Sequence, residues 1–327
     1  MQNTLFSPVF FWLLKSYARL AIRLYCSTII INKPQYLKAS GPLLLSANHP
    51  NSFLDGIILT TLFEKHIYSL ARGDAFKKPL ANTLLRKLHL APVYRTREGV
   101  ENLEHNYTTF ATCLDVFKKK GIVLIFSEGL CENEWHLRPL LKGTARLATS
   151  AWQQGIPLRV LPVGINYNSF KKFGKEVHIH FGQPFSQEVV ADHQTDGKQY
   201  LYFNAELNQQ LQSLVYEIPS QTDPAYQQHF PSKVSLRKKT LLFLPALIGL
   251  LLHYPLYGLS WLVTNTGFKR SGHYDSVIHT LPILLYPLYV LSIVIVTSCY
   301  SWLLAFGAAL LLPMTAWCLA RLNFLRG

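Results

Sequence analysis

Two long stretches without a charged residue do most to limit the structures that this chain can adopt. Residues 240–263 and 276–320 contain no Asp, Glu, Lys or Arg. A helix needs about 20 apolar residues to cross the hydrocarbon core of a bilayer, so the second stretch is long enough for two spans. Only 15% of the 327 residues are charged, against about 25% in an average soluble protein. We therefore expect a soluble part followed by a membrane-embedded tail.

Prolines and basic residues suggest how this tail crosses the membrane. We expect residues 276–320 to form a two-helix hairpin with a tight turn near 298–301. Pro245 and Pro255 interrupt the first stretch. A segment that entered and left on the same side would keep every basic cluster on the cytosolic side, as the positive-inside rule favours. We therefore expect a broken, hairpin-like segment over residues 240–263.

The charge distribution favours a membrane surface as the partner. The formal net charge is +14, and the first acidic residue in the chain is Asp55. A second basic cluster lies directly before the tail and consists of Lys233, Arg237, Lys238 and Lys239. Such a cluster beside an apolar segment is typical of attraction to anionic headgroups. Nucleic acid is not expected, because no zinc-finger or RNA-binding motif accompanies the charge.

The N-terminal segment has the pattern of an amphipathic helix. Residues 8–31 are apolar except for Lys15, Arg19 and Arg23, which recur at every fourth position. On a helix this spacing makes one basic stripe. We interpret it as a helix in the membrane interface with its cations at the headgroups. The alternative is an ordinary amphipathic helix packed on the soluble part.

Between residues 36 and about 215, short apolar runs alternate with helical patterns. Strands are expected over 42–47, 67–71, 90–94, 122–127, 158–165 and 176–181. Helices are expected over 53–64, 78–88, 100–120, 141–154 and 198–216. This alternation predicts an α/β fold, a mostly parallel sheet with helices on both faces. The expected organisation is an interface helix over 1–35, an α/β domain over 36–218, a basic linker over 219–239 and a membrane tail over 240–327.

The stretch from Ser46 to Gly56 is the strongest candidate for chemistry. It follows an expected buried strand and precedes an expected helix, so it places His49 in the connecting turn and Asp55 in the first helical turn. A carboxylate on one imidazole nitrogen fixes the tautomer and makes the other nitrogen a better general base. The alternative is a histidine that stabilises the turn and an aspartate that balances the helix dipole.

Four further stretches follow in order. Pro92-Val93-Tyr94-Arg95 and Phe126-Ser127-Glu128-Gly129 lie at the ends of expected strands, Lys142-Gly143 precedes a helix, and Leu161-Pro162-Val163-Gly164 lies in a later strand. In this order the chain resembles the glycerolipid acyltransferases, the family of lysophosphatidate and glycerol-3-phosphate acyltransferases. The resemblance covers residues 40–185 and excludes the tail. Ligands of such sheets bind beyond the carboxyl ends of strands, so His49, Arg95 and Glu128 are expected at one edge.

The resemblance implies the roles of the candidate catalytic residues. His49 would take the proton from an acceptor hydroxyl that attacks the thioester of an acyl donor, and Asp55 would orient His49. Asn48 belongs to the same motif and is expected either at the substrate or in backbone contacts that shape the turn. Two departures from the family pattern stand out. Five residues rather than four separate His49 from Asp55, and Ser127 replaces the usual proline.

The resemblance also implies the binding residues. Arg95, assisted by Arg97, would hold the phosphate of the acceptor, because a guanidinium fork fits phosphate oxygens. Glu128 and Gly129 would bind the acceptor through a carboxylate and a close backbone approach. Lys142 would hold a second phosphate of donor or acceptor at a helix start. The donor is expected to be acyl-CoA or acyl carrier protein.

The remaining reactive side chains suggest no additional chemistry. The five cysteines are scattered and odd in number, which indicates reduced thiols and not a disulfide framework. No cofactor and no metal site are expected; His178 and His180 share one face of an expected strand, and a half-exposed strand explains this better than zinc. We therefore expect a membrane-bound acyltransferase of phospholipid biosynthesis, with its catalytic domain on the cytoplasmic face. The alternatives are a lipid hydrolase or transacylase with the same dyad, and a non-catalytic lipid-binding membrane protein.

Overall fold

The computed structural model describes residues 8–94, 105–170, 173–191, 195–231, 235–269 and 273–322. Its centre is a seven-stranded sheet with the order β1-β7-β6-β2-β5-β3-β4. All neighbouring strands are parallel except β6 and β7. The strands are β1 (Cys26–Ile31), β2 (Leu43–Ala47), β3 (Ile67–Arg72), β4 (Leu90–Val93), β5 (Ile122–Phe126), β6 (Arg159–Tyr167) and β7 (Lys175–Phe181). The expected mostly parallel sheet is confirmed.

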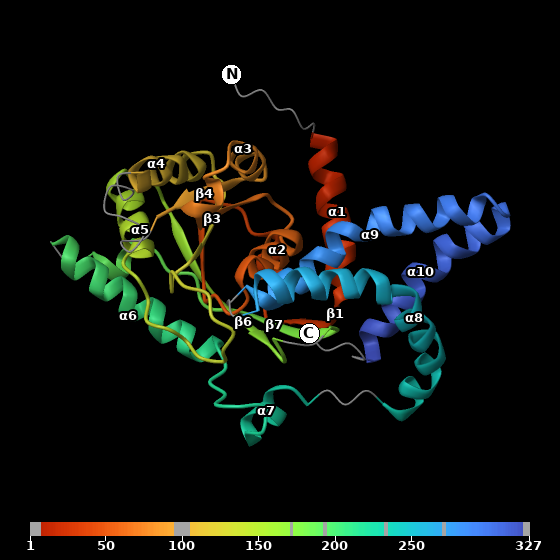
Figure 1. The fold of residues 1–327 in the computed structure, drawn as a ribbon. Coiled ribbons are helices and arrows are strands. Elements are labelled where there is room, and N and C mark those ends of the chain that lie inside the picture. Colours follow the sequence, from red (N-terminus) through yellow and green to blue (C-terminus); the bar gives the residue numbers. More distant parts are fainter. Residues whose placement is uncertain are drawn as a thin grey trace.

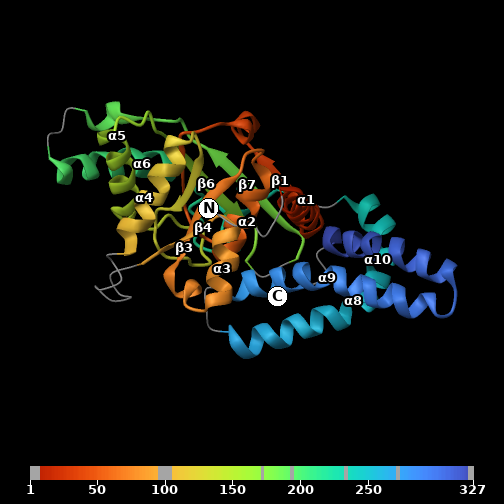
Figure 2. The same cartoon turned by 90° about the horizontal axis from the view of Figure 1, so that it is seen from above.

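Helices cover both faces of this sheet (Figures 1 and 2). Helices α4, α5 and α6 pack on one face, and α1 and α2 pack on the other. The α-helices are α1 (Pro8–Tyr25), α2 (Ser52–Leu62), α3 (Pro79–Lys87), α4 (His105–Lys118), α5 (Gly143–Gln153), α6 (Asp196–Leu214), α7 (Pro224–His229), α8 (Leu236–Gly267), α9 (Tyr274–Ser298) and α10 (Trp302–Leu322).

The central strand β2 shows why its apolar run is continuous. Leu44 packs into the core on the α4–α6 face, whereas Leu43 and Leu45 pack into the core under α1 and α2. Successive side chains of a strand point to opposite faces, so a strand covered on both faces must be apolar at every position. Strand β2 is therefore buried up to its last residue. The turn that follows it carries buried polar side chains at the carboxyl edge of the sheet.

The N-terminal segment differs from its expected form. Helix α1 ends at Tyr25, and residues 26–31 form strand β1, which pairs in parallel with β7. This strand contains Thr28 and three isoleucines, and such β-branched side chains favour an extended backbone. The sheet therefore begins before the boundary expected at residue 36.

Two of the three basic residues of the α1 stripe contact the α/β domain, whereas Arg23 is exposed. Lys15 Nζ donates to the backbone oxygen of Glu64 at 3.2 Å, and Arg19 Nε donates to that of Thr61 at 3.0 Å. These carbonyls lie at the carboxyl end of α2, where cations stabilise a helix. Lys15 and Arg19 therefore contact the α/β domain, which fits the alternative of an amphipathic helix packed on the soluble part. The placement of α1 in the membrane interface stays a prediction. The side chains of Trp12 and Leu13 are exposed.

The tail contains three helices that are long and apolar enough to cross a membrane, namely α8, α9 and α10. Helices α9 and α10 form the expected hairpin, joined by residues 299–301. The expected break in α8 is wrong, because α8 continues through Pro245 and Pro255. It changes direction along its length instead (Figure 1), as helices do at internal prolines. All three helices pack against one another beside the α/β domain (Figures 1 and 2).

Candidate active site

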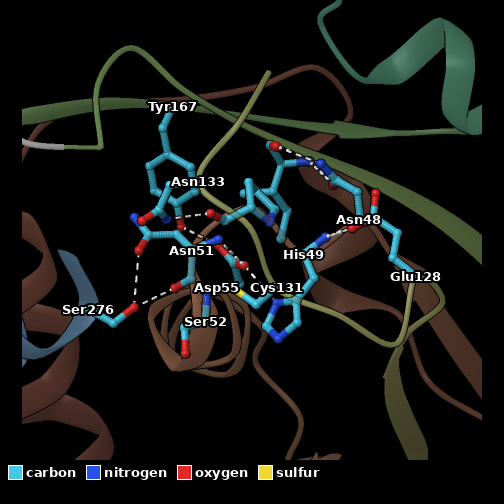
Figure 3. A network of polar contacts seen from close by, with 12 residues as sticks. Asn48, His49, Asn51, Ser52, Asp55, Glu128, Cys131, Asn133, Tyr167 and Ser276 are labelled. Carbon is cyan, nitrogen blue, oxygen red and sulfur yellow. Dashed lines mark hydrogen bonds and ion pairs between the residues drawn. The ribbon is translucent and has the colours of Figure 1, made fainter. Parts of the chain in front are cut away.

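His49 and Asp55 meet in the turn between β2 and α2 (Figure 3). His49 Nδ1 lies 2.9 Å from Asp55 Oδ2. The Asp55 side chain is fully buried, whereas 16% of the His49 side chain is exposed. Among the described residues, no hydrogen-bond partner is present for the other ring nitrogen of His49, Nε2. The pair therefore has one engaged nitrogen and one nitrogen left for a further partner.

Asp55 is held in place by two further donors. The hydroxyl of Tyr167, at the end of β6, donates to Oδ1 at 2.6 Å, and the backbone N–H of Asn51 donates to Oδ2 at 2.8 Å. Burial, reinforced by the negative charge of Asp55, raises the pKa of Tyr167 well above its usual value, so this hydroxyl remains a donor. A carboxylate with both oxygens occupied keeps its orientation, and so does the imidazole that it contacts.

Three other side chains hold the backbone of this turn (Figure 3). Glu128 Oε2 accepts from the backbone N–H of His49 at 2.7 Å. Cys131 Sγ accepts from the N–H of Ser52 at 2.8 Å, and Asn133 Nδ2 donates to the backbone oxygen of Pro50 at 2.8 Å. Ser52 has a positive φ of 48°, which is uncommon for a residue with a side chain. The longer spacer between His49 and Asp55 is therefore accommodated in a tightly held turn.

Glu128 follows β5, and both of its carboxylate oxygens bond to backbone amides. Besides His49, it accepts from the N–H of Arg138 at 2.9 Å. Burial raises its pKa to about 7, and the two amides oppose this shift. His49 and Glu128 thus lie together at the carboxyl edge of the sheet, as expected. In this structure Glu128 orients the His49 turn; acceptor binding by Glu128 stays a prediction.

The His49 ring is further fixed by an aromatic neighbour. It stacks on Phe126, with ring centroids 3.8 Å apart and an interplanar angle of 10°. Neither nearby nucleophile bonds to the ring, because Ser52 Oγ contacts His273 Nδ1 at 2.6 Å and Cys131 contacts the Ser52 backbone. The ring is therefore fixed by Asp55 and Phe126, and its Nε2 has no hydrogen-bond partner among the described residues.

The other motif residues lie around this turn. Both polar groups of the buried Asn48 amide bond to the backbone of Ile165 in β6, at 2.7 and 3.0 Å. The amide thus ties the turn to β6, and substrate binding by Asn48 stays a prediction. Gly129 has a φ of +62°, and a Cβ there would lie 2.2 Å from the Leu141 side chain. Lys142 is exposed at the N-cap of α5.

Ser127 has a structural role that its motif did not predict. Its hydroxyl lies 2.5 Å from Ser46 Oγ in β2 and 2.9 Å from Thr144 Oγ1 in α5. All three side chains are buried, and buried hydroxyls are stabilised by such partners. The serine therefore links strand, loop and helix where the family pattern has a proline.

Arg95 and Arg97 lie outside the described residues, so their phosphate-binding role stays a prediction. The described chain ends one residue earlier, at Tyr94. No group of three or more His, Cys, Asp or Glu side chains suited to a metal ion occurs among the described residues. His178 bonds to Glu176 through Nε2 and to the Tyr216 hydroxyl through Nδ1, each at 2.8 Å.

Several residues of the site come from parts of the chain that the motifs do not cover. Tyr167 lies at the end of β6, beyond the strand expected over 158–165. Asp275 and Ser276 belong to α9 in the tail and contact Asn51. One signal for Asp275 was present, since it is the sole acidic residue after Asp223. An isolated acid at the start of an apolar segment is costly unless it is paired.

One comparison with known proteins, the match to a family model, agrees with the motifs. The family model described as Acyltransferase matches residues 28–166, which include the His49–Asp55 turn, Glu128 and Lys142. Among solved structures, the chain is similar to the 1-acyl-sn-glycerophosphate acyltransferase PlsC from Thermotoga maritima. The identity is 13% and the TM-score 0.40, over 62% of this chain and 80% of that chain. No curated protein matches the sequence. Residues 28–166 thus match the acyltransferase family model. The narrower relation to the glycerolipid acyltransferases, which the motifs indicate, stays a prediction.

Proposed function

We propose that the protein is a membrane-bound O-acyltransferase. It transfers a fatty acyl group from a thioester donor, acyl-CoA or acyl carrier protein, to the free hydroxyl of glycerol-3-phosphate or a lysophospholipid. The observation that carries the proposal is the His49–Asp55 contact of 2.9 Å. It supports proton transfer because the carboxylate is held by two other donors and the second ring nitrogen remains available.

The proposed reaction needs no nucleophile from the protein. His49 Nε2 takes the proton of the acceptor hydroxyl while its oxygen attacks the thioester carbonyl carbon. The C–O bond forms, the C–S bond breaks, and the leaving thiolate takes the proton back from the imidazolium. Asp55 stabilises the imidazolium during this exchange. The positions of Ser52 and Cys131 support direct attack, since neither bonds to the imidazole ring.

Binding of the acceptor is proposed to depend on cations and amides at the same edge of the sheet. Lys142 is exposed at the start of α5, next to the end of β5, because the N–H of Leu141 bonds to the backbone oxygen of Ser127 at 2.8 Å. A helix start and an ammonium group both favour a phosphate. Arg95 directly follows the described part of the loop after β4 and is proposed as the main phosphate ligand.

The membrane location is supported by the tail and by α1. Three apolar helices are long enough to span a bilayer, and Trp12, Leu13 and Leu20 of α1 are exposed. Apolar side chains on an exposed helix are stabilised by the membrane interface. We propose that the catalytic domain faces the cytoplasm, where soluble acyl donors are available.

A panel of acceptors and donors tests the proposed function. Purified protein in phosphatidylglycerol–phosphatidylcholine vesicles is given oleoyl-CoA or oleoyl acyl carrier protein. The acceptor is glycerol-3-phosphate, oleoyl-lysophosphatidate or oleoyl-lysophosphatidylcholine, and products are identified by mass spectrometry. The expected result is a new ester on a phosphorylated glycerol acceptor. Free fatty acid as the sole product would favour a hydrolase, and no turnover of any donor would favour a lipid-binding protein.

A further inference from the structure

The first turn of α9 is in direct contact with the turn that holds the His49–Asp55 pair. Asn51 Nδ2 donates to Asp275 Oδ2 at 2.6 Å. Ser276 Oγ donates to the backbone oxygen of Asn51 at 2.6 Å and lies 3.0 Å from its side-chain oxygen. More than 200 residues separate the two segments in the sequence. Figure 3 shows Ser276 reaching Asn51 on the side of the turn away from Glu128.

Asp275 is itself anchored by a buried charged network. Lys175 Nζ, at the start of β7, lies 2.9 Å from Asp275 Oδ2, and His279 Nδ1 lies 3.0 Å from Oδ1. All three side chains are at most 1% exposed. Buried charges are tolerated only in well-satisfied arrangements, and removing one partner is strongly destabilising. The network therefore gives the first turn of α9 one defined position on the α/β domain.

Asn51 connects this anchor to the proposed catalytic pair. Its backbone N–H bonds to Asp55, while its side chain and backbone oxygen bond to α9. Asn51 is the N-cap residue of α2, yet its side chain makes no capping hydrogen bond within α2. The amide that would ordinarily cap the helix contacts the tail instead. A shift of α9 would therefore move the residue that orients Asp55.

A second contact ties the same two segments together. His273, the N-cap residue of α9, bonds to Ser52 Oγ through Nδ1 at 2.6 Å, and its Nε2 lies 3.4 Å from Arg72 at the end of β3. Ser52 is the residue with positive φ in the same turn. Both residues between Pro50 and Phe53 are thus held by the beginning of α9.

We propose that Asp275 and Ser276 are positioning residues of the acyltransferase site, acting on Asp55 and His49 through Asn51. The inference depends on the proposed roles of His49 and Asp55. It makes the apolar tail part of the site, because the proton-accepting imidazole is aligned only while the first turn of α9 is docked on the α/β domain. The tail therefore has a catalytic consequence beyond membrane attachment.

Ser276→Ala tests this inference with little disturbance of packing. The matched control is Ser260→Ala in α8, since Ser260 is also fully buried and its hydroxyl bonds only to the backbone of its own helix. Steady-state kinetics use oleoyl-CoA and whichever of glycerol-3-phosphate and oleoyl-lysophosphatidate is turned over faster. We expect Ser276→Ala to lower kcat about tenfold, as small misalignments do, with KM within about twofold. Ser260→Ala is expected to retain wild-type kcat.

Asn51→Ala and a double variant separate positioning from a general loss of structure. Asn51→Ala removes the contacts between the Asn51 side chain and α9. The kcat of this variant is therefore expected to fall by a similar factor. In an Asp55→Asn background, Ser276→Ala is expected to have little further effect, because its influence passes through Asp55. Thermal unfolding of each variant gives the folded fraction by which kcat is divided. Full kcat per folded molecule in both Ser276→Ala and Asn51→Ala, or an undiminished effect of Ser276→Ala beside Asp55→Asn, would overturn the inference.

His49→Ala, measured in the same preparation, separates a failure of the positioning role from a failure of the proposed base. If His49→Ala is inactive and the Ser276 and Asn51 variants are fully active, the positioning role fails while the proposed base remains. If His49→Ala keeps wild-type turnover, the proposed base itself fails.

Discussion

Two histidine–carboxylate pairs in this protein have nearly the same separation and different surroundings. His49 lies 2.9 Å from Asp55, and His178 lies 2.8 Å from Glu176. Both nitrogens of His178 are engaged, because Nδ1 bonds to the Tyr216 hydroxyl. His178 also lies within strand β7, whereas His49 lies in the turn beyond β2. Under the proposed function, the contact alone does not distinguish the base. The difference between the two pairs is that, within the described part of the chain, His49 has an unengaged nitrogen at the carboxyl edge of the sheet, whereas both nitrogens of His178 are bonded.

The largest expected difference concerns the two carboxylates. Asp55→Asn should lower kcat by about 10³ to 10⁴-fold, because an imidazole that loses its orienting carboxylate adopts the wrong tautomer. Glu176→Gln should leave kcat within about twofold, since His178 has no proposed part in the reaction. Steady-state kinetics of both variants in the same vesicles measure this contrast. An equal loss of kcat in Asp55→Asn and Glu176→Gln would show that the two histidine–carboxylate pairs do not differ in the reaction.

Glu128 is expected to produce the next largest effect, on stability. Burial raises its pKa from 4.5 to about 7, so its contribution to the free energy of unfolding is present below the lower value and is lost as the pH rises through the higher one. The shift corresponds to about 3 kcal/mol. Between pH 5 and 8, the unfolding temperature of the wild type in detergent should therefore fall more than that of Glu128→Gln. If the unfolding temperatures of the wild type and Glu128→Gln fall in parallel between pH 5 and 8, the raised pKa of Glu128 is contradicted.

Lys142 is expected to show the smallest effect. Lys142→Ala should raise KM for the phosphorylated acceptor or for the donor about threefold to tenfold with little change in kcat, because an exposed ammonium group contributes weakly to binding. The matched control is Lys198→Ala, which removes an exposed lysine near the start of α6. Raised KM values in both variants would indicate a general charge effect instead of a binding site.

Features set by local spacing could be predicted from the sequence. The buried strands β2 and β5 are short apolar runs, and six positions along one turn bring His49 to Asp55. The partners supplied from distant segments could not be predicted in this way. Tyr167 and Asp275 reach the turn across the sheet and from the tail, and no local pattern encodes those contacts. The basic stripe of α1 is similar: periodicity predicts the stripe, but only the position of α2 determines what Lys15 and Arg19 contact.

The turnover number of His49→Ala, measured beside that of His178→Ala, tests directly whether His49 is the base. Both variants are compared with the wild type at saturating oleoyl-CoA and acceptor, and each rate is divided by the folded fraction. We expect His49→Ala to lose acyl transfer by at least about 10³-fold, while His178→Ala keeps it within about twofold. Retained transfer in His49→Ala, or an equal loss in His178→Ala, would contradict the assignment of His49 as the base.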